Sequence, residues 1–171
     1  MKIGIVGLGV VGKACKTGFE HCGYTVIPHD ITLGTKIEDL LEAEIVYLCV
    51  PTPTNDQGEC DTRIVESVIA ELQQVNYEGV IGIKSTVSPG TTQRLIAQYD
   101  DRIVFVPEFL KERSAEYDFV FDHRLLLVGT ENVNHYYLVQ RSHGKLPEDI
   151  MRVTPTEAEL MKYYHNTFNE I

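Results

Sequence analysis

Short apolar runs alternate along the chain with segments whose apolar residues recur every three or four positions. The runs contain few polar residues, as in parallel strands buried on both faces, and the segments between them have the spacing of helices that cover a sheet. This alternation predicts an α/β fold with a doubly wound, mostly parallel sheet and helices on both faces. The runs assigned to strands are 3–6, 24–29, 44–50, 80–84, 102–106, 124–128 and 150–153.

Two helix starts carry local signals. Ser88 followed by Pro89 predicts a helix that begins there, because serine caps helices and proline suits the first helical position. The segment 154–157 has the pattern of a capping box before another apolar helix. No glycine or proline ends that helix. We therefore expect residues 1–153 to form the sheet domain and residues 154–171 to begin a long helix of a longer protein.

The first apolar run ends in Gly7, Gly9 and Gly12, with the spacing Gly-x-Gly-x-x-Gly. The first glycine allows a tight turn, the second leaves room for a pyrophosphate, and the third lets the next helix pack closely on the strand. Asp30 ends the second predicted strand, where a carboxylate can bind both ribose hydroxyls and repel a 2′-phosphate. This order predicts a Rossmann-like domain that binds NAD and not NADP. The alternative is a turn-rich junction with an ordinary surface aspartate.

Composition restricts the class of protein. The 171 residues carry 15 Lys and Arg against 25 Asp and Glu, a formal charge of −10, and contain no basic run, so we expect no nucleic-acid partner. No apolar run approaches the roughly 20 residues of a membrane span, and no signal-peptide pattern precedes the first strand, which predicts a cytoplasmic protein. The four cysteines and six histidines lack metal-ligand spacing, so we predict no metal site.

Three polar segments, 51–54, 85–91 and 107–112, follow predicted strands directly. Because parallel strands end at one edge of a sheet, these segments and the glycine turn are expected along the carboxyl edge, where open α/β sheets bind ligands. Lys162 and Asn166 share one face of the last helix, where they could take the proton of an alcohol or stabilise an alkoxide. On spacing alone, a solvated lysine and a surface asparagine are the simpler interpretation.

Together these motifs resemble the UDP-glucose/GDP-mannose dehydrogenase family, over nearly the whole chain and in the family's order. The specific signals are Val50-Pro51-Thr52-Pro53-Thr54 and Pro107-Glu108-Phe109-Leu110 with Glu112 after it. The glycine pattern is shared with many dehydrogenases. The resemblance implies an NAD-dependent oxidation of the 6-hydroxymethyl group of a nucleotide-linked hexose to a carboxylate, through two hydride transfers and a cysteine-bound thioester. It also implies a homodimer for the complete protein.

The resemblance further implies roles for individual residues. Lys162 and Asn166 are expected to stabilise the oxyanion or alkoxide. Thr86 and Glu112 are expected to position or activate water, with Glu108 shaping the site. The residues expected along NAD are Gly7, Leu8, Gly9, Val10, Val11, Gly12, Asp30, Pro51, Thr52, Pro53, Ser85, Thr86 and Glu112. Those expected at the sugar and its phosphates are Glu108, Phe109, Leu110 and Lys111.

The chain departs from the family in one respect that matters for activity. The family's nucleophilic cysteine lies in a Gly-Gly-x-Cys segment later than residue 171, and none of Cys15, Cys22, Cys49 and Cys60 stands in for it. The family's nucleotide-binding second domain is absent too, so we expect this chain to bind NAD without completing the oxidation alone. Two alternatives remain: a 6-phosphogluconate/3-hydroxyacid-type dehydrogenase domain and a non-catalytic NAD-binding module.

Overall fold

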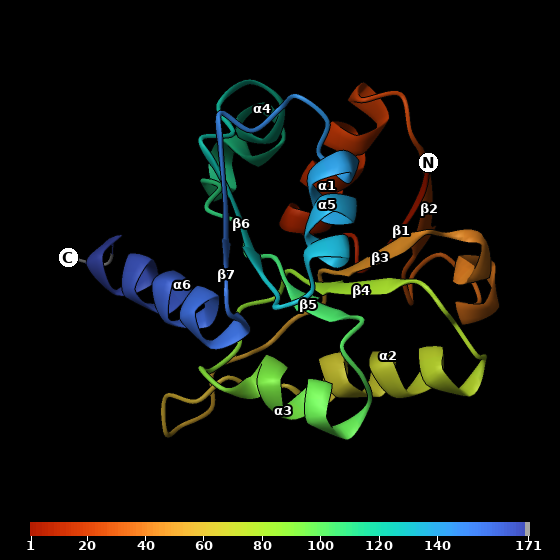
Figure 1. The fold of residues 1–171 in the computed structure, drawn as a ribbon, viewed down its shortest axis with the longest axis horizontal. Coiled ribbons are helices and arrows are strands. Elements are labelled where there is room, and N and C mark those ends of the chain that lie inside the picture. The colour runs from red at the N-terminus through yellow and green to blue at the C-terminus, as the bar shows by residue number, and fades with distance from the viewer. Residues whose placement is uncertain (170–171) are drawn as a thin grey trace.

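One sheet of seven strands forms the centre of the fold in the computed structural model, which describes residues 1–169 (Figure 1). The strands are β1 Lys2–Val6, β2 Thr25–His29, β3 Ile45–Leu48, β4 Val80–Ile83, β5 Ile103–Phe105, β6 Leu125–Gly129 and β7 Asp149–Val153. Their order is β2-β1-β3-β4-β5-β6-β7. Strands β1 to β5 are parallel, β6 pairs antiparallel with β5, and β7 runs parallel to β6. The predicted α/β fold with a mostly parallel sheet is confirmed.

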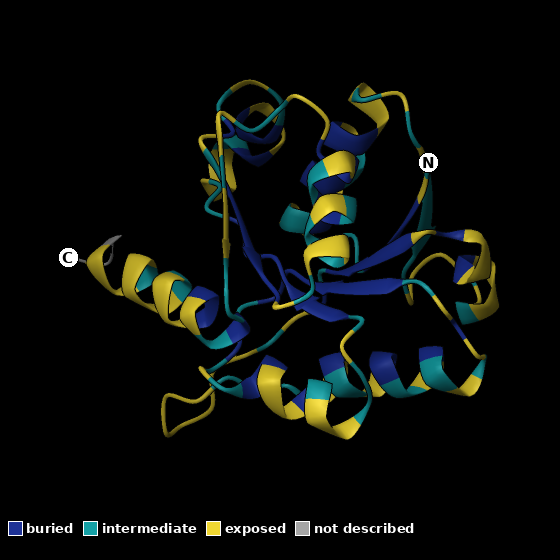
Figure 2. Cartoon of the chain, viewed as in Figure 1, coloured by how far each residue is buried: buried dark blue, intermediate teal, exposed yellow. Residues whose placement is uncertain are grey.

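Helices cover both faces of this sheet, and Figure 2 shows the central strands buried between them. One face carries α1 (Val10–His21), α4 (Ala115–Phe121) and α5 (Val133–Ser142). The other face carries α2 (Arg63–Gln74), α3 (Thr91–Gln98), α6 (Pro155–Asn169) and the 3-10 helix η1 (Ile37–Glu42). A second 3-10 helix, η2 (Glu112–Ser114), precedes α4.

Strand β3 shows why the apolar runs are continuous. Ile45 and Tyr47 belong to the core cluster on the α1 side, whereas Val46 and Leu48 belong to the cluster on the α2 side. All four side chains are inaccessible to solvent, at 0% exposure. Burying one such aliphatic side chain contributes roughly 1.5–3 kcal/mol. The central strands therefore hold the loops at their carboxyl ends in fixed positions.

Helix α3 begins later than the sequence predicts. Ser88 and Pro89 form part of a turn, and the helix begins after Gly90, whose φ of +94° is a left-handed conformation. The Glu159 carboxylate on α6 accepts hydrogen bonds from the N–H groups of Gly90 and Thr92, both at 3.2 Å. A side chain far away in the sequence thus caps α3, which a local signal cannot reveal.

Helix α6 begins as predicted. The N–H of Glu157 donates to Thr154 Oγ1 at 3.2 Å, and the N–H of Thr154 donates to Glu157 Oε1 at 3.1 Å, which is the reciprocal pair of a capping box. The helix packs against α3, β5 and β6. None of the helices in the described part of the chain combines the length and apolar character that a membrane crossing needs.

Candidate functional site

The glycine turn between β1 and α1 has the geometry that its spacing predicts. Gly7 adopts a φ of +91°, and a Cβ on Gly12 would lie 1.9 Å from the Gly7 carbonyl oxygen, so α1 packs closely on the end of β1. A Cβ on Gly9 would meet no atom within 4 Å. Gly9 is the N-cap residue of α1 and, as a glycine, has no side chain that could cap the helix. The turn therefore leaves open space at a helix N-terminus, which suits a phosphate.

Asp30 lies beside this turn at the end of β2. Its Oδ2 accepts a hydrogen bond from the N–H of Leu8 at 2.7 Å, and its Oδ1 accepts from the N–H and the hydroxyl of Thr32 at 2.9 and 2.8 Å. These hydrogen bonds, led by those from Thr32, lower the pKa of the Asp30 carboxyl. The site therefore presents an ionised carboxylate next to the open glycine turn.

A cavity of about 240 Å³ lies at the carboxyl ends of β3, β4 and β5. It is lined by Val11, Cys49, Val50, Thr52, Lys84, Ser85, Thr86, Glu108, Leu110 and Lys162. The Thr52 hydroxyl donates to the Thr86 carbonyl at 2.7 Å, and the Ser85 hydroxyl donates to the Val50 carbonyl at 2.7 Å. These two bonds tie the loops after β3 and β4 together at the wall of the cavity.

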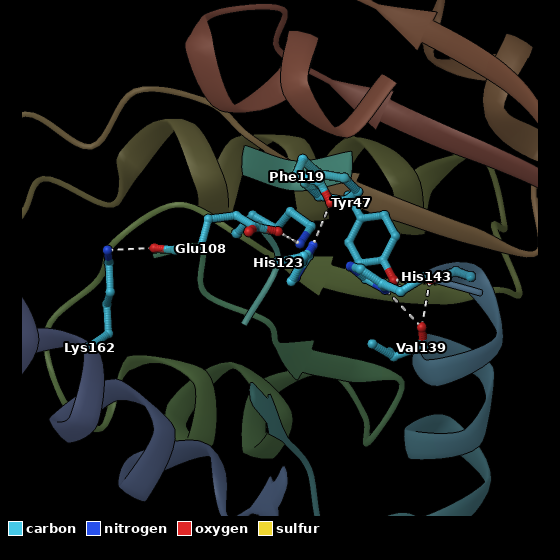
Figure 3. Close-up of polar contacts among 9 residues, drawn as sticks. Tyr47, Glu108, Phe119, His123, Val139, His143 and Lys162 are labelled. Carbon is cyan, nitrogen blue, oxygen red and sulfur yellow. Dashed lines mark hydrogen bonds and ion pairs between the residues drawn. The ribbon is translucent and has the colours of Figure 1, made fainter. Parts of the chain in front are cut away.

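Lys162 reaches this cavity from α6. Its Nζ donates to the backbone carbonyl of Glu108 at 2.6 Å (Figure 3). It also lies 5.2 Å from the centre of the Phe109 ring. Burial lowers the pKa of the Lys162 ammonium, although the Glu108 carboxylate opposes this effect. Lys162 therefore gives up its proton more readily than a solvated lysine does, as an acid or base for a hydroxyl group requires.

The structure does not bring all of the other expected site residues to this cavity. Glu108, Phe109, Leu110 and Lys111 line a neighbouring cavity of about 420 Å³, together with Met161 and His165 of α6. Glu112 is exposed and lines a separate hollow with Val10 and Lys13. Asn166 is half-buried one turn after Lys162, outside the residues that line the 240 Å³ cavity. Pro51 and Pro53 are exposed in the loop after β3.

Sequence reasoning missed a buried polar cluster behind the cavity. Lys84 forms an ion pair with Oε1 of Glu108, and His123 and His143 lie on the same inner side. One ligand atom each of Glu108, His123 and His143 lies within 4.8 Å of the others, as in some metal sites. The sequence gives a weak signal, because Lys84 directly follows the largely apolar run Val80–Ile83.

Known proteins resemble this chain in sequence and in fold. Residues 31–145 match the model of the UDP-glucose/GDP-mannose dehydrogenase family, NAD binding domain. An uncharacterized protein of Methanocaldococcus jannaschii is 29% identical over 98% of this chain and 24% of its own. A UDP-glucose 6-dehydrogenase of Rickettsia felis is 31% identical over 76% of this chain and 31% of its own. A ternary complex of GDP-mannose dehydrogenase from Pseudomonas aeruginosa has a TM-score of 0.88 at 23% identity, over 99% of this chain and 50% of its own.

Proposed function

The chain belongs to the UDP-glucose/GDP-mannose dehydrogenase family as an NAD-binding domain, and we propose that it forms the NAD-binding part of a nucleotide-sugar 6-dehydrogenase. The chain spans 24% to 50% of the length of the three proteins compared above. In this proposal residues 1–153 hold NAD, and residues from 154 onward begin the helix that leads to a substrate domain. A homodimer in the cytoplasm, as the sequence predicts, belongs to the same proposal.

The observation that carries the proposal is the meeting of five segments around one cavity. Val11 comes from the start of α1, Thr52 from the loop after β3 and Thr86 from the loop after β4. Glu108 comes from the segment after β5, and Lys162 comes from α6. These segments are far apart in the sequence, so the fold and not local sequence brings a lysine, hydroxyl groups and the glycine turn to one edge.

The residues beside the glycine turn fit NAD. The open space at Gly9 and the uncapped N-terminus of α1 suit the pyrophosphate, and the Asp30 carboxylate suits a ribose with free hydroxyls. We assign the same function to the remaining expected residues, from Leu8 to Gly12 and from Pro51 to Pro53, and to Ser85, Thr86 and Glu112. When bound, NAD would itself accept the hydride.

Lys162 is assigned the central role at the sugar. Its ammonium can hold a hydrogen bond to the developing alkoxide, and its lowered pKa lets it exchange the hydroxyl proton. Asn166 follows one turn later and would donate to the same oxygen. Thr86 and Glu112 would position water, and Phe109 to Lys111 would contact the sugar and its phosphates, with Glu108 behind them.

The thioester step requires a cysteine that these 171 residues do not provide. Cys49 lines the cavity, but the family's nucleophile lies in a Gly-Gly-x-Cys segment that this sequence does not contain. We therefore expect the 171 residues alone to bind NAD without completing the oxidation of a sugar to the carboxylate.

Calorimetry with NAD and NADP on this chain tests the cofactor site. Asp30→Asn keeps the size of the side chain and removes its charge, so it should weaken NAD binding about tenfold, roughly 1.4 kcal/mol. It should also reduce the ratio of the affinity for NAD to the affinity for NADP. Asp30 also accepts a hydrogen bond from the N–H of Leu8. Urea unfolding of the variant therefore accompanies the titration, so that a loss of stability is told apart from a loss of NAD binding. Unchanged affinity for NAD would remove Asp30 from the ribose site.

Turnover by the protein encoded by the complete reading frame tests the substrate. UDP-glucose, GDP-mannose and UDP-N-acetylhexosamines are offered separately, and two NADH per sugar oxidised are expected for one of them. Turnover of a 3-hydroxyacid, with none of any nucleotide sugar, would establish the 6-phosphogluconate/3-hydroxyacid alternative. Binding of NAD without turnover of either class would establish a non-catalytic module.

A further inference from the structure

Lys84 is a buried charged residue to which the proposed function gives no role. It directly follows β4, its side chain is 0% exposed, and its ammonium pairs with Oε1 of Glu108. The ammonium also lies 4.8 Å from the centre of the Tyr47 ring and 5.9 Å from that of Phe119. An unpaired ammonium in such surroundings would cost several kcal/mol, so Lys84 depends on the Glu108 carboxylate.

The sheet makes room for this cation. Tyr47 on β3 lies opposite Gly82 on β4, and a Cβ on Gly82 would come within 2.6 Å of the Tyr47 ring. Because side chains alternate along a strand, Gly82 and Lys84 face the same side of the sheet. The missing side chain at Gly82 lets the aromatic ring lie beside the Lys84 ammonium, which is a favourable cation–π arrangement.

His123 and His143 enclose the pair without adding charge. Each follows the end of a helix, and its Nδ1 donates to a carbonyl four residues earlier, at 3.0 Å for His123 and 2.9 Å for His143. Burial lowers the pKa of both imidazoles. This arrangement directs Nε2 inward as in a metal site, but the Lys84 ammonium already occupies Oε1 of Glu108 and repels a divalent cation. The Lys84 ammonium, and not a metal ion, is therefore the positive charge of this cluster.

Glu108 links the cluster to the candidate active site. Its carboxylate points inward to Lys84, while its backbone carbonyl accepts the hydrogen bond from Lys162 at 2.6 Å (Figure 3). We propose that Lys84 is a positioning residue for Lys162: it holds Glu108 in place and offsets part of the carboxylate charge near Lys162. This inference rests on the proposed function only for the catalytic role of Lys162. The contacts among Lys84, Glu108 and Lys162 do not depend on that role.

The charges of Lys84 and Glu108 predict the direction in which each single variant shifts the proton affinity of Lys162. Burial lowers the pKa of Lys162, the Glu108 carboxylate raises it against this effect, and the Lys84 ammonium paired with that carboxylate offsets part of its charge. Lys84→Met leaves the carboxylate uncompensated, so Lys162 should bind its proton more tightly. Glu108→Gln leaves the Lys84 ammonium uncompensated, so Lys162 should bind its proton less tightly. Among the other titratable side chains of the described residues, Cys49 lines the same cavity, and Glu159 and His165 lie on the same helix as Lys162. Neither variant replaces any of them.

The test is an NMR titration of carbon-13-labelled lysine side chains in the 171-residue chain, with the Lys162 signal assigned by its loss in Lys162→Arg. We expect the Lys162 midpoint to rise by roughly one pH unit in Lys84→Met and to fall by a similar amount in Glu108→Gln. The double variant Lys84→Met/Glu108→Gln should return it towards the wild-type value. Lys16→Met is the matched control, since Lys16 forms an exposed ion pair with Glu20 at 2.8 Å.

Shifts of the same sign in the two single variants, or no shift in folded protein, would overturn the proposal. So would an equal shift in Lys16→Met. If Lys84→Met does not fold, the midpoint of Glu108→Gln must still lie below that of the double variant. Stoichiometric metal in the purified chain, lost in His143→Ala, would also overturn it. The titration uses neither NAD nor sugar, so its outcome is independent of the proposed function.

Discussion

Gly9 and Gly12 belong to one motif, but substitutions at the two positions should affect different properties. Substitution of Gly9 should weaken NAD binding, whereas substitution of Gly12 should lower the stability of the fold. A Cβ on Gly9 would meet no atom within 4 Å, so Gly9→Val should change the free energy of unfolding by less than about 1 kcal/mol. Its side chain would fill the space assigned to the pyrophosphate, so NAD affinity should fall at least about tenfold. Calorimetry and urea unfolding measure the two effects.

Gly12→Ala is the control for this prediction. Its Cβ would lie 1.9 Å from the Gly7 carbonyl oxygen, which backbone movement must relieve, and we expect a destabilisation of more than about 2 kcal/mol. NAD affinity in folded Gly9→Val equal to that of the wild type would show that the pyrophosphate does not lie on this turn.

Single residues also show where sequence reasoning ends. The glycine geometry could be predicted because the spacing itself encodes a turn and a close helix contact. Lys84 could not, since a lysine at the end of a strand is usually solvated. Its burial depends on Glu108 and on two histidines at the ends of α4 and α5, which no spacing rule connects.

At the level of elements, the contact between α3 and α6 should respond to pH. Glu159 is 0% exposed, and burial raises the pKa of its carboxyl to about 7, although three hydrogen bonds from Gly90 and Thr92 favour its ionised form. An unfolded glutamate titrates near about 4.3. The folded state therefore binds this proton more tightly, and the associated stability is present below the unfolded value and lost as pH rises through about 7.

We predict that the stability of the wild type relative to Glu159→Gln falls by roughly 2 kcal/mol between about pH 5 and pH 8, because only the wild type loses a buried proton. Urea unfolding of both proteins over this range measures it. Glu157→Gln is the matched control on the same helix: hydrogen bonds with Thr154 lower the pKa of Glu157, so its contribution should instead disappear towards acid pH. A difference between wild type and Glu159→Gln that does not vary with pH would contradict the account.

The same helix contact explains which element boundaries could be predicted. The start of α6 is encoded locally by Thr154 and Glu157, and the structure has it there. The start of α3 depends on a carboxylate 69 residues later than Gly90, so the local signal at Ser88 and Pro89 placed it wrongly. The direction of β6 was equally hidden, because an apolar run has the same pattern in a parallel and an antiparallel strand.

For the molecule as a whole, the sequence predicts the edge of the sheet at which the loops gather. It predicts less well which side chains contact one another at that edge. The alternation of strands and helices places every loop after β1, β3, β4 and β5 at one edge, and the 240 Å³ cavity lies there. Which of these loops share a cavity depends on side-chain packing. Glu112, for example, is expected beside Thr86 but lines a different hollow.

The net charge of the molecule leads to a prediction about salt. A chain with a formal charge of −10 repels an anionic cofactor at long range, so NAD must be held by backbone N–H groups and local contacts. Added salt screens the repulsion and leaves the short contacts almost unchanged. NAD affinity measured by calorimetry should therefore stay within about twofold, or rise, when ionic strength increases from about 0.01 M to about 0.15 M. Any residual binding of NADP should rise more steeply, because its 2′-phosphate adds negative charge. A steep loss of NAD affinity with salt would show instead that a cluster of lysines or arginines binds the phosphates.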